Sequence, residues 1–295
     1  SGCHVDPVAI IRLATTFNTI FMNQYSVAAA KHAAGLTVAA TVQVLHGDLD
    51  SAACVVRPPG HHSETGCCMG FGVVNSVAMA AKAALEAGAS RVLIVDWDIH
   101  HGNGTQQIFE SDDRVLYFSA HGLYKFPAFS PHPSTPDGIR VDLQSPTFVG
   151  LGAGAGYTVN VGWTEENYGD PEYLALWERL LLPVARSFRP DIVLVSAGFD
   201  SAAGDEEGYM VTPTGYASLT QQLLGLADGK VVVVLEGGYN IPAITLGMHG
   251  CVGALLGAAE GLIPTGEAPA PAKPQALADI DATVAVQRQF WSCLR

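Results

Sequence analysis

The stretch "VDWDIHHGNG", residues 95–104, places four titratable side chains within six positions: Asp96, Asp98, His100 and His101. Carboxylates and imidazoles bind divalent metals, and imidazole also carries protons near neutral pH. Asp98 and His100 are two residues apart and follow an apolar run, so at the end of a strand their side chains point the same way. Asp200 follows a later apolar run and completes a three-ligand site. These ligands suit Zn²⁺, but also Fe²⁺ or Mn²⁺. An isolated Asp-x-His pair is more commonly a cap or a core pair.

Two adjacent histidines, His61 and His62 in "RPPGHHSE", form a second cluster. An imidazole has the proton affinity needed to take a proton from water at a metal and return it to a leaving amine. Such rings need orienting partners, and Asp96 and Asn103 are of the right type to hold their far nitrogens. Histidine pairs in loops are more often solvated, so this interpretation depends on their position beside the metal site.

The third cluster, "LEGGYN", carries Tyr239 behind two glycines. A phenol there is able to donate a hydrogen bond to a developing oxyanion opposite a metal, although a turn tyrosine without chemistry is equally common. Phe71 in "GCCMGFG" is a candidate wall of an apolar channel, while a buried core aromatic is its commoner role.

Short β-branched runs alternate with longer Ala- and Leu-rich stretches, a pattern that predicts an α/β fold with a parallel sheet between helices. The predicted strands are Ala53–Val56, Val92–Val95, Val115–Phe118, Tyr157–Val161, Ile192–Ser196 and Val231–Leu235. The clearest predicted helices are Ser26–Ala34, Asn75–Ala87, Pro171–Ser187, Thr214–Ala227 and Pro242–Gly257. Each polar cluster follows a strand, and ligands bind outside the carboxyl ends of such strands. We therefore expect a single three-layer α/β/α domain with one active site at that edge of a mostly parallel sheet.

The composition changes near the end of the chain, where "PTGEAPAPAKPQ" is rich in Pro and Ala. We expect a catalytic domain over residues 1–261 and a linker over residues 262–278. The amphipathic pattern of residues 279–295 predicts a C-terminal helix that packs on the same domain.

The charge balance of the chain excludes several classes of protein. With 15 Lys and Arg against 28 Asp and Glu, the net charge of −13 argues against direct nucleic-acid binding. The six cysteines have neither the density nor the spacing of a disulfide scaffold, which favours a reducing compartment. Neither a secretory leader nor a membrane-spanning run is visible, so we expect no membrane association.

Taken together and in order, six segments resemble the zinc-dependent histone deacetylase family, part of the arginase/deacetylase superfamily. They are "RPPGHHSE", "GFGVVNSVAMAA", "RVLIVDWDIHHGNGTQQIF", "VLYFSAH", "PDIVLVSAGFDSAAGDEEG" and "VVVVLEGGYN". The Trp and Asn of "DWDIHHGNG" and the segment "VTPTGYA" are most similar to class II members. The resemblance implies hydrolysis of the acetyl amide of N6-acetyl-lysine in histones or other proteins, and membership of a corepressor-type complex.

The resemblance also implies roles for individual residues. Asp98, His100 and Asp200 would hold the zinc ion, and metal-bound water would be the nucleophile. His61 and His62 would be general base and acid, in an order left open, with Asp96 orienting His61, Asn103 orienting His62 and Tyr239 polarising the carbonyl. Further residues are implied for the acyl-lysine tunnel: Phe71, Gly70, Gly238 and Glu207. Two structural K⁺ sites are implied, an inner one at Asp96, Asp98, His100, Ser119 and Ala120, and an outer one at Phe109, Asp112, Val115 and Tyr157.

Several alternatives stay open on the sequence. Glu207 matches a glutamate of relatives that prefer acetylated polyamines, but a solvated surface residue is its commoner role. A weakly active acetyl-lysine-binding scaffold is a third interpretation, against which Tyr239 argues. The second tunnel aromatic is Phe126 or Phe129, and no acidic rim residue is identifiable near the start. Gly102 stands where a two-metal, arginase-like site needs a carboxylate, so one metal is expected. We expect a nuclear or cytoplasmic location, or both.

Overall fold

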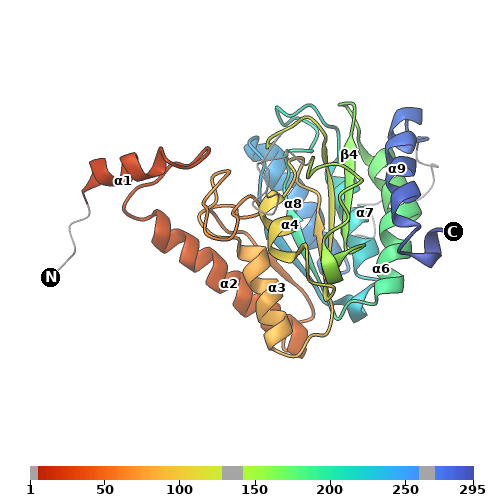
Figure 1. Ribbon diagram of the computed structural model, residues 1–295, viewed down its shortest axis with the longest axis horizontal. Coiled ribbons are helices and arrows are strands. Elements are labelled where there is room, and N and C mark those ends of the chain that lie inside the picture. The colour runs from red at the N-terminus through yellow and green to blue at the C-terminus, as the bar shows by residue number, and fades with distance from the viewer. Residues whose placement is uncertain (1–5, 128–141, 259–269) are drawn as a thin grey trace.

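The computed structural model describes residues 6–127, 142–258 and 270–295. Six strands form one sheet in the order β1-β6-β5-β2-β3-β4, and every pairing between them is parallel. The strands are β1 (Ala52–Cys54), β2 (Val92–Asp96), β3 (Val115–Gly122), β4 (Thr158–Trp163), β5 (Ile192–Ala197) and β6 (Val231–Leu235). Helices cover both faces of the sheet (Figure 1). The predicted three-layer fold is confirmed.

The helices fall into two groups along the chain. Before the fourth strand lie α1 (Pro7–Ala14), α2 (Ser26–His46), α3 (Ser76–Glu86) and α4 (Asn103–Phe109). After it lie α5 (Asp170–Leu176), the π-helix Trp177–Leu181, α6 (Leu182–Phe188), α7 (Pro213–Leu223), α8 (Ile241–Leu255) and α9 (Pro274–Gln287). Short 3₁₀ turns occupy Gly152–Gly154, Ala227–Gly229 and Ser292–Leu294.

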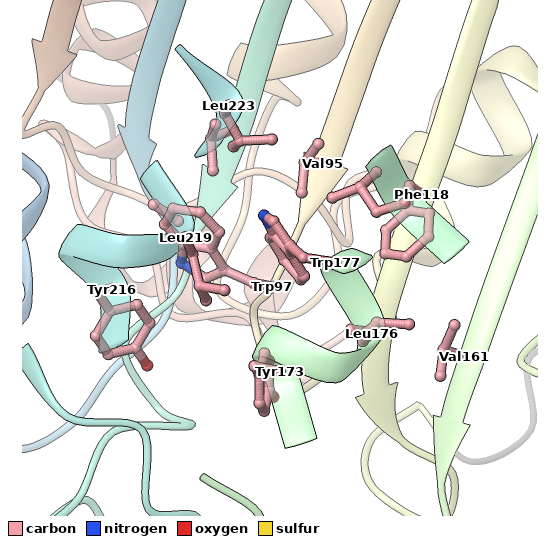
Figure 2. Packing of buried hydrophobic residues seen from close by; sticks show 14 of the residues in the cluster. Val95, Trp97, Phe118, Val161, Tyr173, Leu176, Trp177, Tyr216, Leu219 and Leu223 are labelled. Carbon is pink, nitrogen blue, oxygen red and sulfur yellow. The ribbon is translucent and has the colours of Figure 1, made fainter. Parts of the chain in front are cut away.

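Alternation along the strands divides the core into two layers. In β2, Leu93 and Val95 pack into the cluster formed with α5–α9, whereas Val92 and Ile94 pack against α2 and α3. Both sets are fully buried, as expected for a parallel sheet covered on two faces. The larger layer is rich in aromatic side chains: Trp97 lies 5.8 Å from Tyr216 and 6.3 Å from Trp177 between ring centroids (Figure 2).

Two helix predictions differ most from the structure, and a third, over Thr214–Ala227, was too long because α7 ends at Leu223. The helix predicted over Ser26–Ala34 continues to His46, because Thr37, Thr41 and Val44 extend the buried stripe and only Gly47, in the left-handed region, ends it. The helix predicted over residues 171–187 is interrupted by the π-helix directly before Pro183, where proline removes a backbone donor from the helix.

The C-terminal helix covers the free edge of β4 (Figure 1). Thr283 Oγ1 donates to the Asn160 carbonyl at 2.9 Å, and Gln287 Nε2 donates to the Thr158 carbonyl at 2.8 Å. In the described chain β4 is the last strand of the sheet, so no further strand pairs with these carbonyl groups, and the two side chains of α9 satisfy them instead. The helix begins at Pro274 and not at residue 279 as predicted, because proline at the first helical position loses no hydrogen bond. The predicted linker boundary at residue 278 is therefore wrong.

The described cysteines are all free: Cys54, Cys67, Cys68, Cys251 and Cys293. Within the same residues, no helix combines the length and hydropathy required to cross a bilayer.

Candidate metal centre and active site

The three predicted metal ligands lie together at the carboxyl edge of the sheet. Ligand atoms of Asp98, His100 and Asp200 are all within 4.8 Å of one another, and all three residues are buried. His100 Nδ1 is 3.0 Å from Asp200 Oδ2 and 3.2 Å from Asp98 Oδ1. Strand β2 delivers the first two residues and the adjacent β5 delivers the third. This donor set fits a divalent cation with an open coordination position.

The charges at this centre also fit a cation. Burial and the charge of Asp98 raise the pKa of Asp200 to about 7. Burial favours the neutral form of Asp98 as well, but His61 and the hydrogen-bonded His100 outweigh it and hold the pKa of Asp98 below its ordinary value. Two crowded carboxylates with little solvent favour a bound positive charge.

Main-chain donors fix the two carboxylates in place. Gly237 N donates to Asp98 Oδ2 at 2.8 Å, and Ile99 N donates to Asp200 Oδ1 at 2.9 Å. A Cβ at Gly237 would lie 2.4 Å from Asp200 Oδ2, so only glycine allows β6 to approach the centre this closely. The "LEGGYN" motif therefore serves the carboxylates as well as carrying Tyr239.

The histidine pair lies beside this centre with each ring held by one partner. His61 Nδ1 is 3.1 Å from Asp96 Oδ2, and His62 Nδ1 is 2.9 Å from Asn103 Oδ1. These are the contacts that the orienting roles require, although the catalytic roles themselves stay predictions. Because Nδ1 of each ring donates to its partner, Nε2 is the nitrogen left for proton transfer.

The two rings differ electrostatically. Burial opposes protonation of His61, but the charges of Asp98 and Asp96 outweigh it and raise its pKa to about 10. Burial, together with the charge of His61, lowers the pKa of His62. Neighbouring imidazoles with such different proton affinities are typical of a site that divides acid and base tasks.

Three further residues hold the pair and had no predicted role. Buried Glu236 accepts hydrogen bonds from Gly60 N at 2.6 Å and His61 N at 3.2 Å. Tyr117 Oη donates to Asp96 Oδ2 at 3.0 Å, and Asn103 Nδ2 donates to Glu64 Oε1 at 2.6 Å. For Glu236 the available signal was a glutamate directly after an apolar strand, next to two glycines.

A cavity of about 320 Å³ leads to the metal centre. Its walls include both histidines of the pair and His100, together with Phe71, Phe126, Tyr239, Gly70 and Gly237. Phe126 packs edge-on against His62 with ring centroids 5.0 Å apart, and Phe71 packs edge-on against Tyr239 with ring centroids 6.3 Å apart. Of the two candidates for the second tunnel aromatic, Phe126 lines the cavity, and Phe129 lies outside the described residues.

The two glycines predicted for the cavity wall, Gly70 and Gly238, differ in their position relative to the cavity. A Cβ on Gly70 would lie 2.3 Å from His62 Cδ2, so glycine is required for this wall to reach the histidine. Gly237 lines the cavity, whereas a Cβ on Gly238 would meet Ile244 at 2.8 Å and Phe199 at 3.3 Å; the predicted substrate contact of Gly238 stays a prediction. Burial and the charges of Asp98 and Asp200 raise the pKa of Tyr239, so its hydroxyl keeps its proton at neutral pH.

Glu207 is a wall residue of this cavity and not a solvated surface residue. Its Oε1 lies 3.4 Å from His100 Nε2, its Oε2 lies 3.1 Å from Lys125 Nζ, and its side chain is 22% exposed. The turn "GDEEG" after β5 is what carries this side chain back over the sheet edge. Acidic residues in exposed-looking turns cannot be placed from sequence alone, because turn geometry decides where they point.

The residues named for K⁺ form two groups. Asp96 is paired in register with Ser119 across β2 and β3, which places the inner group around one strand junction. In the outer group, Asp112 N donates to the Phe109 carbonyl, Val115 N donates to the Asp112 carbonyl, and Tyr117 N donates to the Tyr157 carbonyl. The Asp112 carboxylate is bound by Arg114.

A second metal of the arginase kind does not fit at Gly102. A Cβ at this position would lie 2.4 Å from both Asp96 Oδ2 and Tyr117 Oη. There is no room for an added carboxylate. In the part of the chain that the structure describes, the Asp98, His100 and Asp200 group is the one cluster with metal-ligand geometry.

Comparison with known proteins decides the family. Residues 5–255 match the family described as "Histone deacetylase domain". The chain belongs to the histone deacetylase family. It is 44% identical over 250 residues to Histone deacetylase 5 of Arabidopsis thaliana, covering 83% of this chain and 36% of that protein. It is 42% identical over 282 residues to Histone deacetylase clr3 of Schizosaccharomyces pombe, covering 94% of this chain and 39% of that protein.

Solved histone deacetylase structures share the fold. The crystal structure of the HDA15 HD domain aligns with a TM-score of 0.79 and 39% identity, over 92% of this chain and 72% of that one. The structure of the histone deacetylase Clr3 aligns with a TM-score of 0.79 and 40% identity, over 93% and 43%. The chain thus spans less than half the length of the curated relatives that it matches here. The resemblance stated from the motifs is confirmed at the level of the histone deacetylase family and its superfamily.

Proposed function

We propose that this histone deacetylase family chain hydrolyses the acetyl amide of N6-acetyl-lysine in histones or other proteins. The observation that carries the proposal is the convergence of three groups on one cavity. These are the buried Asp98, His100 and Asp200 set, the two oriented histidines, and the protonated Tyr239 hydroxyl. An amide hydrolase needs a metal or equivalent electrophile, proton carriers and an oxyanion donor, and this cavity offers candidates for each.

The metal ligands would hold Zn²⁺, which when bound supplies Lewis-acid chemistry and lowers the pKa of water. Nε2 of His61 and Nε2 of His62 would carry the proton between the attacking water and the departing amine. The Tyr239 hydroxyl would donate to the oxygen of the acetyl carbonyl as negative charge develops there. Phe71 and Phe126 would flank the aliphatic part of the lysine and exclude water.

The class II assignment and the K⁺ sites belong to the same proposal. The class II-like motif residues have structural roles: Trp97 fills the core, Asn103 holds His62, and Thr212 Oγ1 accepts a hydrogen bond from Gly215 N at the start of α7. Structural K⁺ ions would bind main-chain carbonyls beneath the metal centre and near the start of β3. A corepressor-type complex and acetylated histone tails are the proposed partners.

An acetylpolyamine amidohydrolase is the second candidate function, and the position of Glu207 favours it. A carboxylate on the cavity wall would attract a second amine of the substrate. Glu206 lines the same cavity. Glu207→Leu should then reduce turnover of an N-acetylated polyamine while sparing an acetyl-lysine peptide.

The test combines metal content with turnover. The purified protein is analysed for bound Zn²⁺ and offered an acetyl-lysine peptide and an N-acetylated polyamine in parallel. One zinc ion per chain, with peptide turnover that a hydroxamate abolishes, supports lysine deacetylation. Preference for the polyamine supports the second candidate. One bound zinc without turnover of either substrate contradicts both and favours a binding or scaffold role.

A further inference from the structure

Glu207 has two neighbours in the described chain that carry positive charge: the metal-site residue His100 on the cavity side, and Lys125. Lys125 Nζ is 3.1 Å from Glu207 Oε2 and also donates to the Glu207 main-chain carbonyl at 3.2 Å. On its other side, the same ammonium donates to Glu166 Oε1 at 2.9 Å. The Lys125 side chain is 23% exposed, so solvent screens these contacts only in part.

The three acceptors hold the ammonium group beside the Glu207 carboxylate. Lys125 itself does not line the cavity, whereas Glu206 and Glu207 do. Burial opposes the charged form of Lys125, but Glu166 and Glu207 outweigh it and raise its pKa, so the residue stays protonated. The carboxylate that faces a substrate is therefore already paired with a positive charge.

We infer that Lys125 is a specificity-determining residue, because its ion pair with Glu207 decides whether the cavity offers an unpaired carboxylate to a cationic substrate. The inference rests on the proposed amide hydrolase function. A substrate with a second ammonium group must compete with Lys125 for Glu207, whereas the neutral side chain of acetyl-lysine has no such requirement. Lys125 thus favours acetyl-lysine peptides over N-acetylated polyamines although Glu207 is present.

The test compares kcat/KM for an N-acetylated polyamine with kcat/KM for an acetyl-lysine peptide. In Lys125→Met, the polyamine-to-peptide ratio should rise about tenfold, because the Glu207 carboxylate loses its ion pair with the lysine ammonium. Lys125→Arg keeps the charge and should leave the ratio within about twofold. In the double variant Lys125→Met/Glu207→Gln, the increase should disappear. An unchanged ratio in Lys125→Met, or an increase that persists in the double variant, overturns the inference.

A variant of Glu166, the other carboxylate that binds Lys125, tests the same ion pair and should change the polyamine-to-peptide ratio in the opposite direction. Glu166→Gln leaves Lys125 to Glu207 alone, so the polyamine-to-peptide ratio should fall below that of the unmodified protein. The Glu166 side chain is 58% exposed, so its replacement should leave folding intact. Glu166→Gln therefore still tests the inference if Lys125→Met does not fold. A ratio that does not fall contradicts the inference.

If the unmodified protein hydrolyses neither substrate, the proposed function is wrong, but the role of Lys125 is still open to test. The same comparison is then made by calorimetric binding of the N-acetylated polyamine and the peptide to the zinc-loaded protein. Tighter polyamine binding in Lys125→Met than in Lys125→Arg upholds the role of Lys125, and equal binding refutes it.

Discussion

His62 and Asn103 form a hydrogen-bonded pair in which the histidine Nδ1 donates to the asparagine Oδ1 over 2.9 Å. A second hydrogen bond fixes the orientation of the asparagine amide, because its Nδ2 donates to Glu64 Oε1. The ring is thereby held in the tautomer that presents Nε2 to the cavity.

The first prediction concerns this pair. Asn103→Ala should lower kcat about 10- to 100-fold with little change in KM, since the loss of an orienting partner misplaces the ring without removing substrate contacts. Zinc content should stay at the level of the unmodified protein. Steady-state kinetics measure the effect, and exposed Gln289→Ala serves as the control. Full activity in Asn103→Ala would show that His62 needs no such partner.

The second prediction concerns the Tyr239 hydroxyl. Tyr239→Phe should reduce turnover by about 10²–10³ because one donor to the developing oxyanion is lost. Bound zinc should not change, since the hydroxyl is not among the metal ligands. Tyr25→Phe, at a 67% exposed tyrosine, is the matched control. Normal turnover in Tyr239→Phe would contradict the assigned role.

The third prediction concerns the metal. Zinc should raise the free energy of unfolding, by about 2.7 kcal/mol at a concentration 100-fold above its Kd, because binding relieves the crowding of Asp98 and Asp200. Asp200→Asn should weaken zinc affinity and remove most of this stabilisation, whereas exposed Glu178→Gln should not. Thermal melts with and without zinc measure both effects, and equal zinc-dependent shifts in the two variants would exclude Asp200 as a ligand.

The fourth prediction concerns the pH dependence of stability. Burial lowers the pKa of His121 to about 4, although its Nε2 bonds to the Gln144 carbonyl. The folded protein therefore binds fewer protons here than the unfolded chain, so stability falls as the pH decreases from about 6.5 to 4, by up to about 1.4 kcal/mol per pH unit. His121→Gln should flatten this dependence.

Urea unfolding of the metal-free protein at pH 7.5, 5.5 and 4.5 isolates the contribution of His121 from metal loss. The quantity compared is the difference in unfolding free energy between the unmodified protein and His121→Gln. A difference that does not change between these pH values would show that His121 titrates normally.

The fifth prediction concerns the docking of α9. Asp279 accepts hydrogen bonds from Thr164 N and Oγ1 and from Tyr168 Oη. Asp279→Ala leaves these donors without their acceptor and should destabilise the protein by about 1–3 kcal/mol. Asp281→Ala, at an exposed ion pair with Arg179, should cost less than about 1 kcal/mol. Equal effects in chemical denaturation would mean that the Asp279 contacts do not hold the helix.

The sequence alone determined the layer architecture, because a parallel sheet covered on both faces produces fully apolar strands separated by helical stretches. All six strands were predicted to within a residue of their starts, whereas the predicted end of β3 at Phe118 was too early, because buried polar residues replace the apolar run beyond it. Helix ends were less predictable, since packing extended α2 beyond Gly35 and a proline interrupted the α5–α6 segment.

The sequence also indicated the metal ligands and the histidine pair, because residue types with chemical roles stand directly behind the strands. What only the tertiary structure decided was which buried groups meet across long separations. Glu236 lies 176 positions from Gly60 along the chain, yet its carboxylate accepts that residue's N–H. Likewise, turn geometry and not residue type brings Glu207 to the cavity wall and into contact with Lys125. Local patterns reveal what each residue is able to do, but contacts between distant segments depend on the folded chain.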